Sequence, residues 1–145
     1  MDNVTETIST TPDQRPPFDV AWEGRRRLAE ALRRLNETAL ITDIPAEDLC
    51  ALADRIATET AKLAKLPHIA GRKGHGQRHA ERGEEMKDFN YEASPATGFS
   101  NAVSVPTHIW NENGLVQAVA MPGWSHEGPS GCVHGGVIAL LLDQL

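Results

Sequence analysis

The stretch GPSGCVHGGVIALLLDQL, residues 128–145, decides the fold of this chain. In it, Gly135 and Gly136 follow His134 and precede the apolar run 137–142. Glycines between a loop and an apolar run are typical of a helix N-terminus, where the first amides have no partner within the helix. The helix dipole also favours negative charge there, so these amides suit an oxyanion or a polarised carbonyl. The pattern therefore predicts a helix that begins at the two glycines, with an anion-favouring site at its start.

Asp143 directly follows this apolar run. Residues 137–142 are apolar on every side, which predicts a helix that is buried all round. A carboxylate that emerges from a buried helix is costly unless it has partners or a chemical role. Two interpretations stay open from these residues: Asp143 is a functional carboxylate, or it caps a turn and faces solvent at the helix end.

The composition is that of one ordinary globular domain, with 145 residues, of which 40% are hydrophobic and 23% charged. A net charge of −6 argues against a dedicated nucleic-acid binder. No apolar run approaches the ~20 residues that cross a bilayer, and the N-terminus lacks the pattern of a secretory signal. Cys50 and Cys132 form neither a CxxC pair nor a disulfide framework. These features predict a soluble cytoplasmic protein.

The chain divides into segments of different character, and together they predict an α+β fold. Residues 1–17 are polar and predict a disordered tail. Residues 18–66 predict a helical hairpin, and residues 67–93, rich in glycine and histidine, a flexible linker whose glycines argue against a stable helix. Residues 94–145 then carry the predicted strands and the terminal helix.

Within the predicted hairpin, apolar residues recur at helical spacing over residues 21–38 and about 45–65, and Pro67 ends the second helix. Two amphipathic helices must bury their apolar stripes on something. Four arginines lie largely off the first stripe: Arg25, Arg26, Arg33 and Arg34. The stripes are Leu28, Leu32 and Leu35 in the first helix, and Leu49, Leu52, Ile56 and Leu63 in the second.

The strands are predicted after an extended lead-in over residues 94–106. Residues 114–121, GLVQAVAM, alternate as a strand in which only Gln117 is polar, so both of its faces are expected to be covered. Residues 108–110 are predicted to form an earlier strand, paired with it through the turn at 111–114.

HGGVIALLLD resembles the signature of hot-dog fold acyl-CoA thioesterases of the PaaI-like group, which show HGG with an aspartate nine residues after the histidine. The preceding EGPSGCV resembles the EGP-x-G-x-V lead-in of one branch of that group. The match is tight over about residues 127–145, looser back to about Ser94, and does not reach the N-terminal helices. Many relatives carry an asparagine shortly before HGG, where this chain has Gly128 and its neighbours. The resemblance implies a central helix wrapped by an antiparallel sheet whose remaining strands are absent here, so we expect a fragment truncated inside that helix.

The resemblance also implies a reaction: hydrolysis of an acyl-CoA thioester to a free acid and coenzyme A, with no metal and no cofactor. The backbone N–H of Gly135 would polarise the thioester carbonyl, and Asp143 would act as general base or nucleophile. His134 and Gly136 would bind substrate by shaping the loop and the helix start.

A distance argument adds a second copy of the chain to this site. Eight residues separate Gly135 from Asp143, which is about 12 Å along one helix at 1.5 Å per residue. If both act on one carbonyl, the glycine comes from one protomer and the aspartate from another, with two equivalent sites per dimer. The expected partners are therefore the acyl-CoA substrate and a second copy, in a homodimer or dimer of dimers.

The alternative hypothesis is a non-catalytic acyl-thioester-binding or protein-interaction module with hot-dog ancestry, in which the helical hairpin is the interaction element. Dehydratases and hydratases of the same fold use a histidine-based arrangement that this sequence does not show. Replacing Asp143 separates the two hypotheses, because only the catalytic one requires the carboxylate for thiol release.

Other side chains have a structural interpretation that outweighs a functional one. Glycines beside the histidines argue against a helical pair of metal ligands. The basic residues near them are explained by a solvated linker. The tryptophans Trp22, Trp110 and Trp124 are explained by packing. Neighbours in a tight loop rarely form a Cys–His nucleophile pair. The functional alternatives are a metal set from His68, His75, His79 and His126, anion steering by Arg72, Lys73, Arg78 and Arg82, an acyl pocket at Trp124, and nucleophilic Cys132 beside His134.

Overall fold

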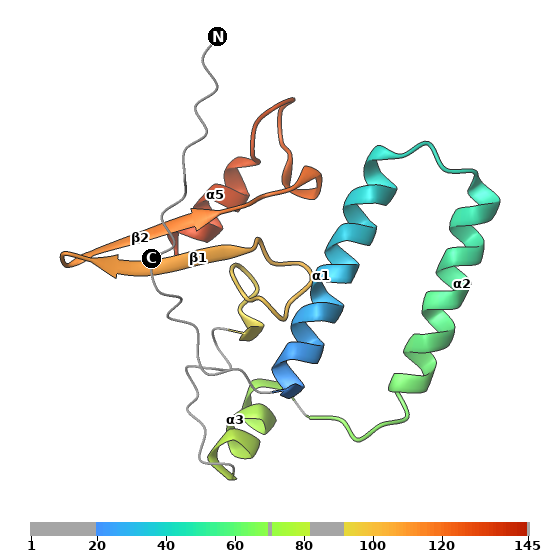
Figure 1. Cartoon of the computed structure of the whole chain (residues 1–145), viewed down its shortest axis with the longest axis horizontal. Coiled ribbons are helices and arrows are strands. Elements are labelled where there is room, and N and C mark those ends of the chain that lie inside the picture. The colour runs from blue at the N-terminus through green and yellow to red at the C-terminus, as the bar shows by residue number, and fades with distance from the viewer. Residues whose placement is uncertain (1–19, 70, 82–91, 145) are drawn as a thin grey trace.

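The computed structural model describes residues 20–69, 71–81 and 92–144, and the predicted disordered tail, residues 1–17, lies outside them (Figure 1). The chain is α+β, as predicted. No helix among the described residues is long and apolar enough to span a bilayer. The elements are α1 (Val20–Ile41), α2 (Ala46–Leu63), α3 (Gly71–Glu81), β1 (Thr107–Glu112), β2 (Leu115–Ala120), the 3-10 helix η1 (Trp124–His126) and α5 (Gly135–Leu142).

The pair of amphipathic helices predicted in the first half of the chain is confirmed as α1 and α2, with ends displaced by a few residues. Pro45 precedes α2 with φ −52°, and its carbonyl accepts hydrogen bonds from the N–H groups of Asp48 and Leu49. Proline is tolerated here because the first turn of a helix needs no backbone donor.

The buried side of α1 is not the predicted leucine side. Ala29 is only 3% exposed and lies near Arg26 and Arg33, whereas Leu28 and Leu32 are 52% and 38% exposed. Arg26 and Arg33, which the sequence placed off the leucine stripe, lie on the buried side of the helix. Both side chains are mostly buried, because they reach across to the segment 92–107.

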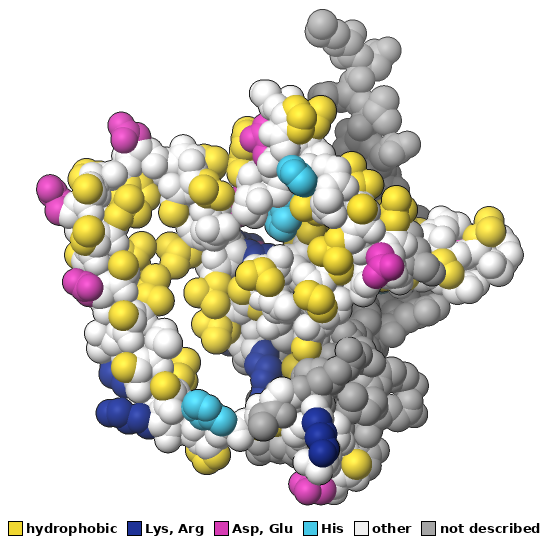
Figure 2. All heavy atoms as spheres, turned by 180° about the vertical axis from the view of Figure 1, so that it is seen from behind, with side chains coloured by type: hydrophobic (Ala, Val, Ile, Leu, Met, Phe, Trp, Pro, Cys, Tyr) yellow, Lys and Arg dark blue, Asp and Glu magenta, His cyan; other side chains and the backbone are white. Residues whose placement is uncertain are grey.

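The apolar stripes of α1 and α2 face each other across an open groove (Figure 2). None of the α2 residues, all of which the structure describes, is buried. In Figure 1, α2 stands on the far side of α1 from the sheet, so no other described element covers it. A cavity of about 260 Å³ separates the helices and is lined by Leu32, Leu35, Asn36, Ala39, Leu49, Leu52, Ala53 and Ile56.

A helix, α3, occupies part of the segment that the sequence predicted as a flexible linker. The expectation that glycines prevent a helix here is wrong for Gly71–Glu81. Between its glycines this stretch consists mostly of residues with good helix propensity, among them arginine, lysine, glutamine and alanine. Residue 70 and residues 82–91 of the predicted linker lie outside the described residues.

The buried core lies in the segment 92–107, beside α1. Ala96 and Val105 are 1% and 2% exposed, and a hydrogen bond of 3.0 Å joins the Val105 N–H to the Ala96 carbonyl. A Cβ on Gly98 would stand 2.6 Å from the carbonyl oxygens of Glu92 and Ser94, so the chain folds back on itself where only glycine fits. The predicted extended lead-in is therefore wrong: this segment is a compact, internally hydrogen-bonded loop.

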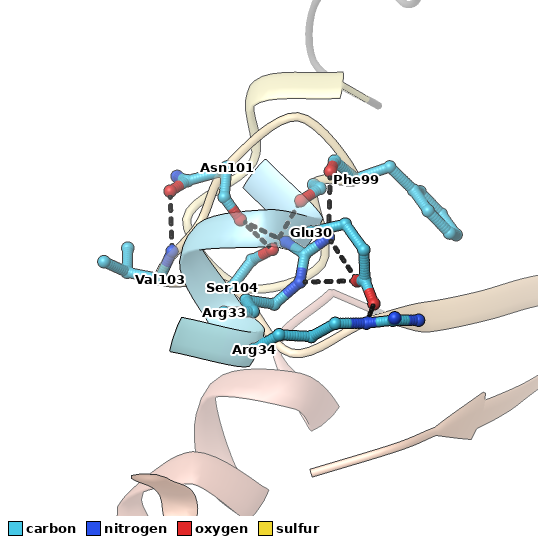
Figure 3. Close-up of polar contacts among 8 residues, drawn as sticks. Glu30, Arg33, Arg34, Phe99, Asn101, Val103 and Ser104 are labelled. Atoms are coloured by element: carbon cyan, nitrogen blue, oxygen red, sulfur yellow. Dashed lines mark hydrogen bonds and ion pairs between the residues drawn. The ribbon is translucent and has the colours of Figure 1, made fainter. Parts of the chain in front are cut away.

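Two arginine side chains of α1 hold this loop, and Figure 3 shows one of them, Arg33. Arg33 donates from Nη1 to the Asn101 carbonyl at 2.8 Å and from Nη2 to the Phe99 carbonyl at 3.3 Å. About two turns nearer the N-terminus of α1, Arg26 forms an ion pair with Glu92, whose side chain is 2% exposed. The Glu92 carboxylate also accepts a hydrogen bond of 2.6 Å from the Ser100 hydroxyl.

The predicted strand pair is confirmed as an antiparallel hairpin in which Thr107 pairs with Ala120 and Glu112 with Leu115. The turn is tighter than predicted: Asn113 and Gly114 alone connect the strands, with φ of 53° and 80°. Two positive φ values are the geometry that Asn-Gly favours in a two-residue hairpin.

The faces of β2 are exposed, although the sequence predicted that both would be covered. Leu115, Val116 and Val119 are 67%, 48% and 44% exposed. Within the described residues the sheet consists of β1 and β2 alone, and a two-stranded sheet cannot cover its own faces.

Candidate functional site

The start of α5 has the local geometry that the HGG sequence predicted. His134 is the N-cap, with φ −60° and ψ 131°, and its Nδ1 accepts a hydrogen bond of 3.0 Å from the Gly136 N–H. The His134 carbonyl accepts from Val137 and Ile138 at 2.9 and 3.2 Å. No described residue accepts a hydrogen bond from the Gly135 N–H. The helix start therefore presents the Gly135 amide, which has no acceptor among the described residues, beside three amides that bond to His134.

The two glycines differ in what surrounds them. A Cβ on Gly136 would lie 3.1 Å from Nδ1 of His134, so a side chain at this position would crowd the histidine cap. A Cβ on Gly135 would meet nothing within 4 Å. The space beside Gly135 is thus open to a ligand, and Gly136 allows the histidine to fold over the helix start.

The loop before α5 closes on itself and rests on η1. A bridge joins Glu127 to Val133, and the His134 N–H donates to the His126 carbonyl at 2.9 Å. The Glu127 side chain accepts from the Gly131 N–H at 2.7 Å. A shallow cavity of about 230 Å³ lies beside this loop, lined by Pro122, Gly123, Trp124, His126, Glu127, Gly131, Cys132 and Val133. Trp124, for which the sequence left open a role in an acyl pocket, therefore lines a cavity next to the helix start.

Asp143 is the C-cap of α5 and is exposed. Its N–H donates to the Ala139 carbonyl at 3.1 Å, and the neighbouring Gln144 accepts at its side-chain oxygen a hydrogen bond of 3.3 Å from the Ser94 hydroxyl. Asp143 and Gly135 lie at opposite ends of α5, so the structure does not bring them together within one chain.

The expectation that α5 is buried all round is wrong for this structure. Ile138, Leu140 and Leu142 are 47%, 42% and 64% exposed, and none of the helix residues, described throughout, is buried. The reason is the sheet: β1 and β2 are too few to wrap an apolar helix.

The sequence did not predict that Glu37 of α1 contacts the loop before the site. The Glu37 carboxylate accepts hydrogen bonds from the Ser125 N–H at 3.1 Å, from the Ser125 hydroxyl at 2.5 Å and from the Trp124 N–H. Partial desolvation raises the pKa of Glu37, but the hydrogen bonds from Ser125 and Trp124 and the charge of His126 together hold the pKa below its ordinary value of 4.5. No sequence pattern could reveal this contact, because 88 positions separate Glu37 from Ser125.

The other residues considered for a function do not come together in one site among the described residues. Within the described part of the chain, no group of three or more His, Cys, Asp or Glu residues could hold a metal ion, and the side chains of His75 and His79 lie outside that part. Among the basic residues weighed for anion steering, Lys73 is exposed. Cys132 is an exposed free thiol.

Comparison with protein-family models, with curated proteins and with solved structures gave no match for this chain.

Proposed function

We propose that this chain carries part of the active site of an acyl-CoA thioesterase, in which the α5 start binds the thioester carbonyl and Asp143 activates water. The observation that supports the proposal most is the bare Gly135 amide at a histidine-capped helix start. A backbone N–H at a helix N-terminus stabilises negative charge that develops on a carbonyl oxygen.

The proposed chemistry needs only groups of this chain and water. Asp143 takes a proton from water, and the resulting hydroxide attacks the thioester carbon. The tetrahedral oxyanion accepts a hydrogen bond from the Gly135 N–H. Its collapse breaks the carbon–sulfur bond, and the coenzyme A thiolate leaves and takes up the proton, so that a free acid and a thiol are formed.

The separation of the two groups requires a second copy. Gly135 and Asp143 lie about 12 Å apart along α5, so the carbonyl that contacts one Gly135 must meet the Asp143 of another protomer. The exposed apolar side chains of α5 also need a cover in any active form, and pairing of two copies contributes to it.

We expect Asp143→Ala to abolish thiol release from acyl-CoA, because without the carboxylate no group activates the water. The measurement is the absorbance of a thiol reagent over a panel of short and long acyl-CoA substrates. Asp54→Ala, which removes an exposed aspartate from α2, is the matched control and should keep its rate. Thiol release by Asp143→Ala at the wild-type rate would refute the assignment.

Mixing two inactive variants tests the shared site. Gly135→Pro removes the amide hydrogen, and proline suits both the first helical position and the extended backbone of His134. Each variant alone should be inactive. A one-to-one mixture of Gly135→Pro and Asp143→Ala should regain about a quarter of wild-type activity, since half of the dimers are mixed and each has one intact site. No recovery after verified subunit exchange would exclude the shared site.

The groove between α1 and α2 favours the second candidate function, a non-catalytic binding or protein-interaction module. Opposed apolar stripes over a cavity of about 260 Å³ offer a docking surface for an amphipathic helix. Calorimetry separates the candidates: an acyl-CoA that binds the wild-type protein with no thiol release indicates binding without catalysis.

A further inference from the structure

Glu37 holds η1 at its first two residues. Its two carboxylate oxygens accept three hydrogen bonds, from the backbone N–H of Trp124 and from the N–H and hydroxyl of Ser125. Because the N–H groups at the start of a helix lack partners, a carboxylate from elsewhere in the chain takes the place of a local cap. Among the described elements, η1 is the one that α1 contacts most extensively.

The contact passes directly to the start of α5. The last residue of η1, His126, accepts at its carbonyl the hydrogen bond from the His134 N–H at 2.9 Å. His134 in turn caps α5 and precedes Gly135. Glu37 is thus joined to the bare amide through one short helix and one backbone hydrogen bond.

Gly123, the N-cap of η1, leaves room for this carboxylate. A Cβ at Gly123 would stand 2.5 Å from one Glu37 oxygen and 2.8 Å from the other, far inside contact distance. The φ of Gly123 is −98°, a value open to any residue, so its backbone does not require glycine. The space that glycine leaves is the space that the Glu37 carboxylate fills.

We propose that Glu37 is a positioning residue: it fixes η1 so that the His126 carbonyl orients His134 and the Gly135 amide is presented to substrate. This inference rests on the proposed function for its catalytic consequence. It gives the N-terminal helix, which lies outside the thioesterase-like motif, a direct part in shaping the site.

The first experiment uses the whole chain and needs no activity. Amide signals of Gly135 and Gly136 in ¹⁵N–¹H spectra should shift in Glu37→Ala, and the His134 amide should exchange with solvent about 10-fold faster, since its acceptor is no longer held. Gly123→Ala keeps Glu37 but displaces its carboxylate, so it should produce the same changes. Glu23→Ala removes a carboxylate from the exposed first turn of the same helix and should change neither signal.

The second experiment measures catalysis. A positioning role predicts that Glu37→Ala and Gly123→Ala lower kcat by about 10- to 100-fold with KM little changed, because a displacement near 1 Å is enough for such a loss. Glu37→Gln, which keeps one acceptor oxygen and replaces the other with an NH2 donor, should lie between Ala and wild type. The melting temperature, recorded for each variant, separates local displacement from general unfolding.

The outcomes separate this inference from the proposed function. Signals of Gly135, Gly136 and His134 that coincide with wild type in both Glu37→Ala and Gly123→Ala would overturn the positioning role. Wild-type kcat in both variants would do the same. If the signals shift in the variants but the wild-type protein releases no thiol, the thioesterase proposal is refuted. The structural coupling of Glu37 to Gly135 then still stands.

Discussion

The Glu92 carboxylate is the most enclosed charge among the described residues, since the whole residue is 1% exposed. Arg26 and the Ser100 hydroxyl both bind it, so its lone pairs and its charge have partners. A buried ion pair contributes little relative to an apolar pair of the same shape, but removing one member leaves an uncompensated charge. Arg26 therefore matters chiefly because Glu92 cannot return to water without unfolding the loop.

We expect Arg26→Ala to lower the free energy of unfolding by about 3–5 kcal/mol, the range for breaking a buried pair. Arg34→Ala is the matched control from the same helix: Arg34 is 80% exposed and pairs with Glu30 at the surface, a contact worth about 0–1 kcal/mol. Urea denaturation followed by circular dichroism measures both. Equal losses in the two variants would contradict the assignment of Arg26 as the buried anchor.

For individual residues, the sequence predicted features set by neighbours in the chain and missed contacts between positions far apart in the chain. The start of α5 at Gly135 depends on neighbours in the chain, so the HGG motif was sufficient to predict it. Arg26 and Glu37 bind partners 66 and 88 positions away. Their neighbours in α1 give no sign of those partners, so the sequence predicted neither contact.

Among the elements, α2 has few contacts with the rest of the described chain. Its residues, all described, include none that is buried, and its apolar stripe faces an open cavity. Several alanines in its sequence favour a helix by propensity, but an isolated helix of this length is marginal in water. Among the described residues, the contacts of α1 with the segment 92–107 have no counterpart in α2.

Hydrogen exchange should therefore distinguish the two helices. We expect amides in the middle of α2 to exchange at least ~10-fold faster than those around Ala29 in α1, because local opening of α2 exposes little additional surface. Mass spectrometry of peptides from a timed exchange series resolves both regions in one sample. Equal protection would mean that α2 has a partner in solution, and dilution of the sample would then show whether that partner is a second copy.

Periodicity predicted the existence and type of these elements better than their surroundings. The positions of α1, α2 and the hairpin β1–β2 follow from apolar spacing and from the Asn113-Gly114 turn. The buried face of α1 does not, because Arg26 and Arg33 are buried through polar contacts that a hydrophobic pattern counts as exposed. The exposure of α5 could not be read from its own residues either, since it depends on how many strands lie over it.

For the molecule as a whole, acid should weaken the link between α1 and the site. The folded pKa of Glu37 lies below its ordinary value of 4.5, so its contribution to stability is complete above that pH and is lost as the pH falls through the folded value. The pKa of Glu30 is also lowered, first by its hydrogen bond with Arg34, but that pair lies at the surface.

We expect stability to fall on acidification below about pH 4.5 and to fall less steeply in Glu37→Gln, which has no proton to gain at this position. Urea midpoints measured between about pH 6 and pH 3 give the two slopes, and Glu23→Gln controls for removal of a charge from the same helix. Parallel slopes for wild type and Glu37→Gln would show that the hydrogen bonds to η1 do not stabilise the charged form.

The hot-dog assignment is a prediction about an assembly larger than the described part of this chain. The helix start and the strand pair fit it, while the exposed side chains of α5 and β2 show which surfaces a complete layer would have to cover. The reaction, the substrate and the pairing of copies stay predictions that the variants of Gly135 and Asp143 test.

The long-range contacts of α1 also bear on the order in which parts of this protein fold. The α1–α2 turn closes over a few residues, whereas the contacts of Arg26, Arg33 and Glu37 close spans of 66 to 88 residues. Because entropy lost on closing a chain grows with its length, the helices and the β-hairpin can nucleate early and independently. We therefore expect docking onto α1 to follow the formation of the helices and the hairpin.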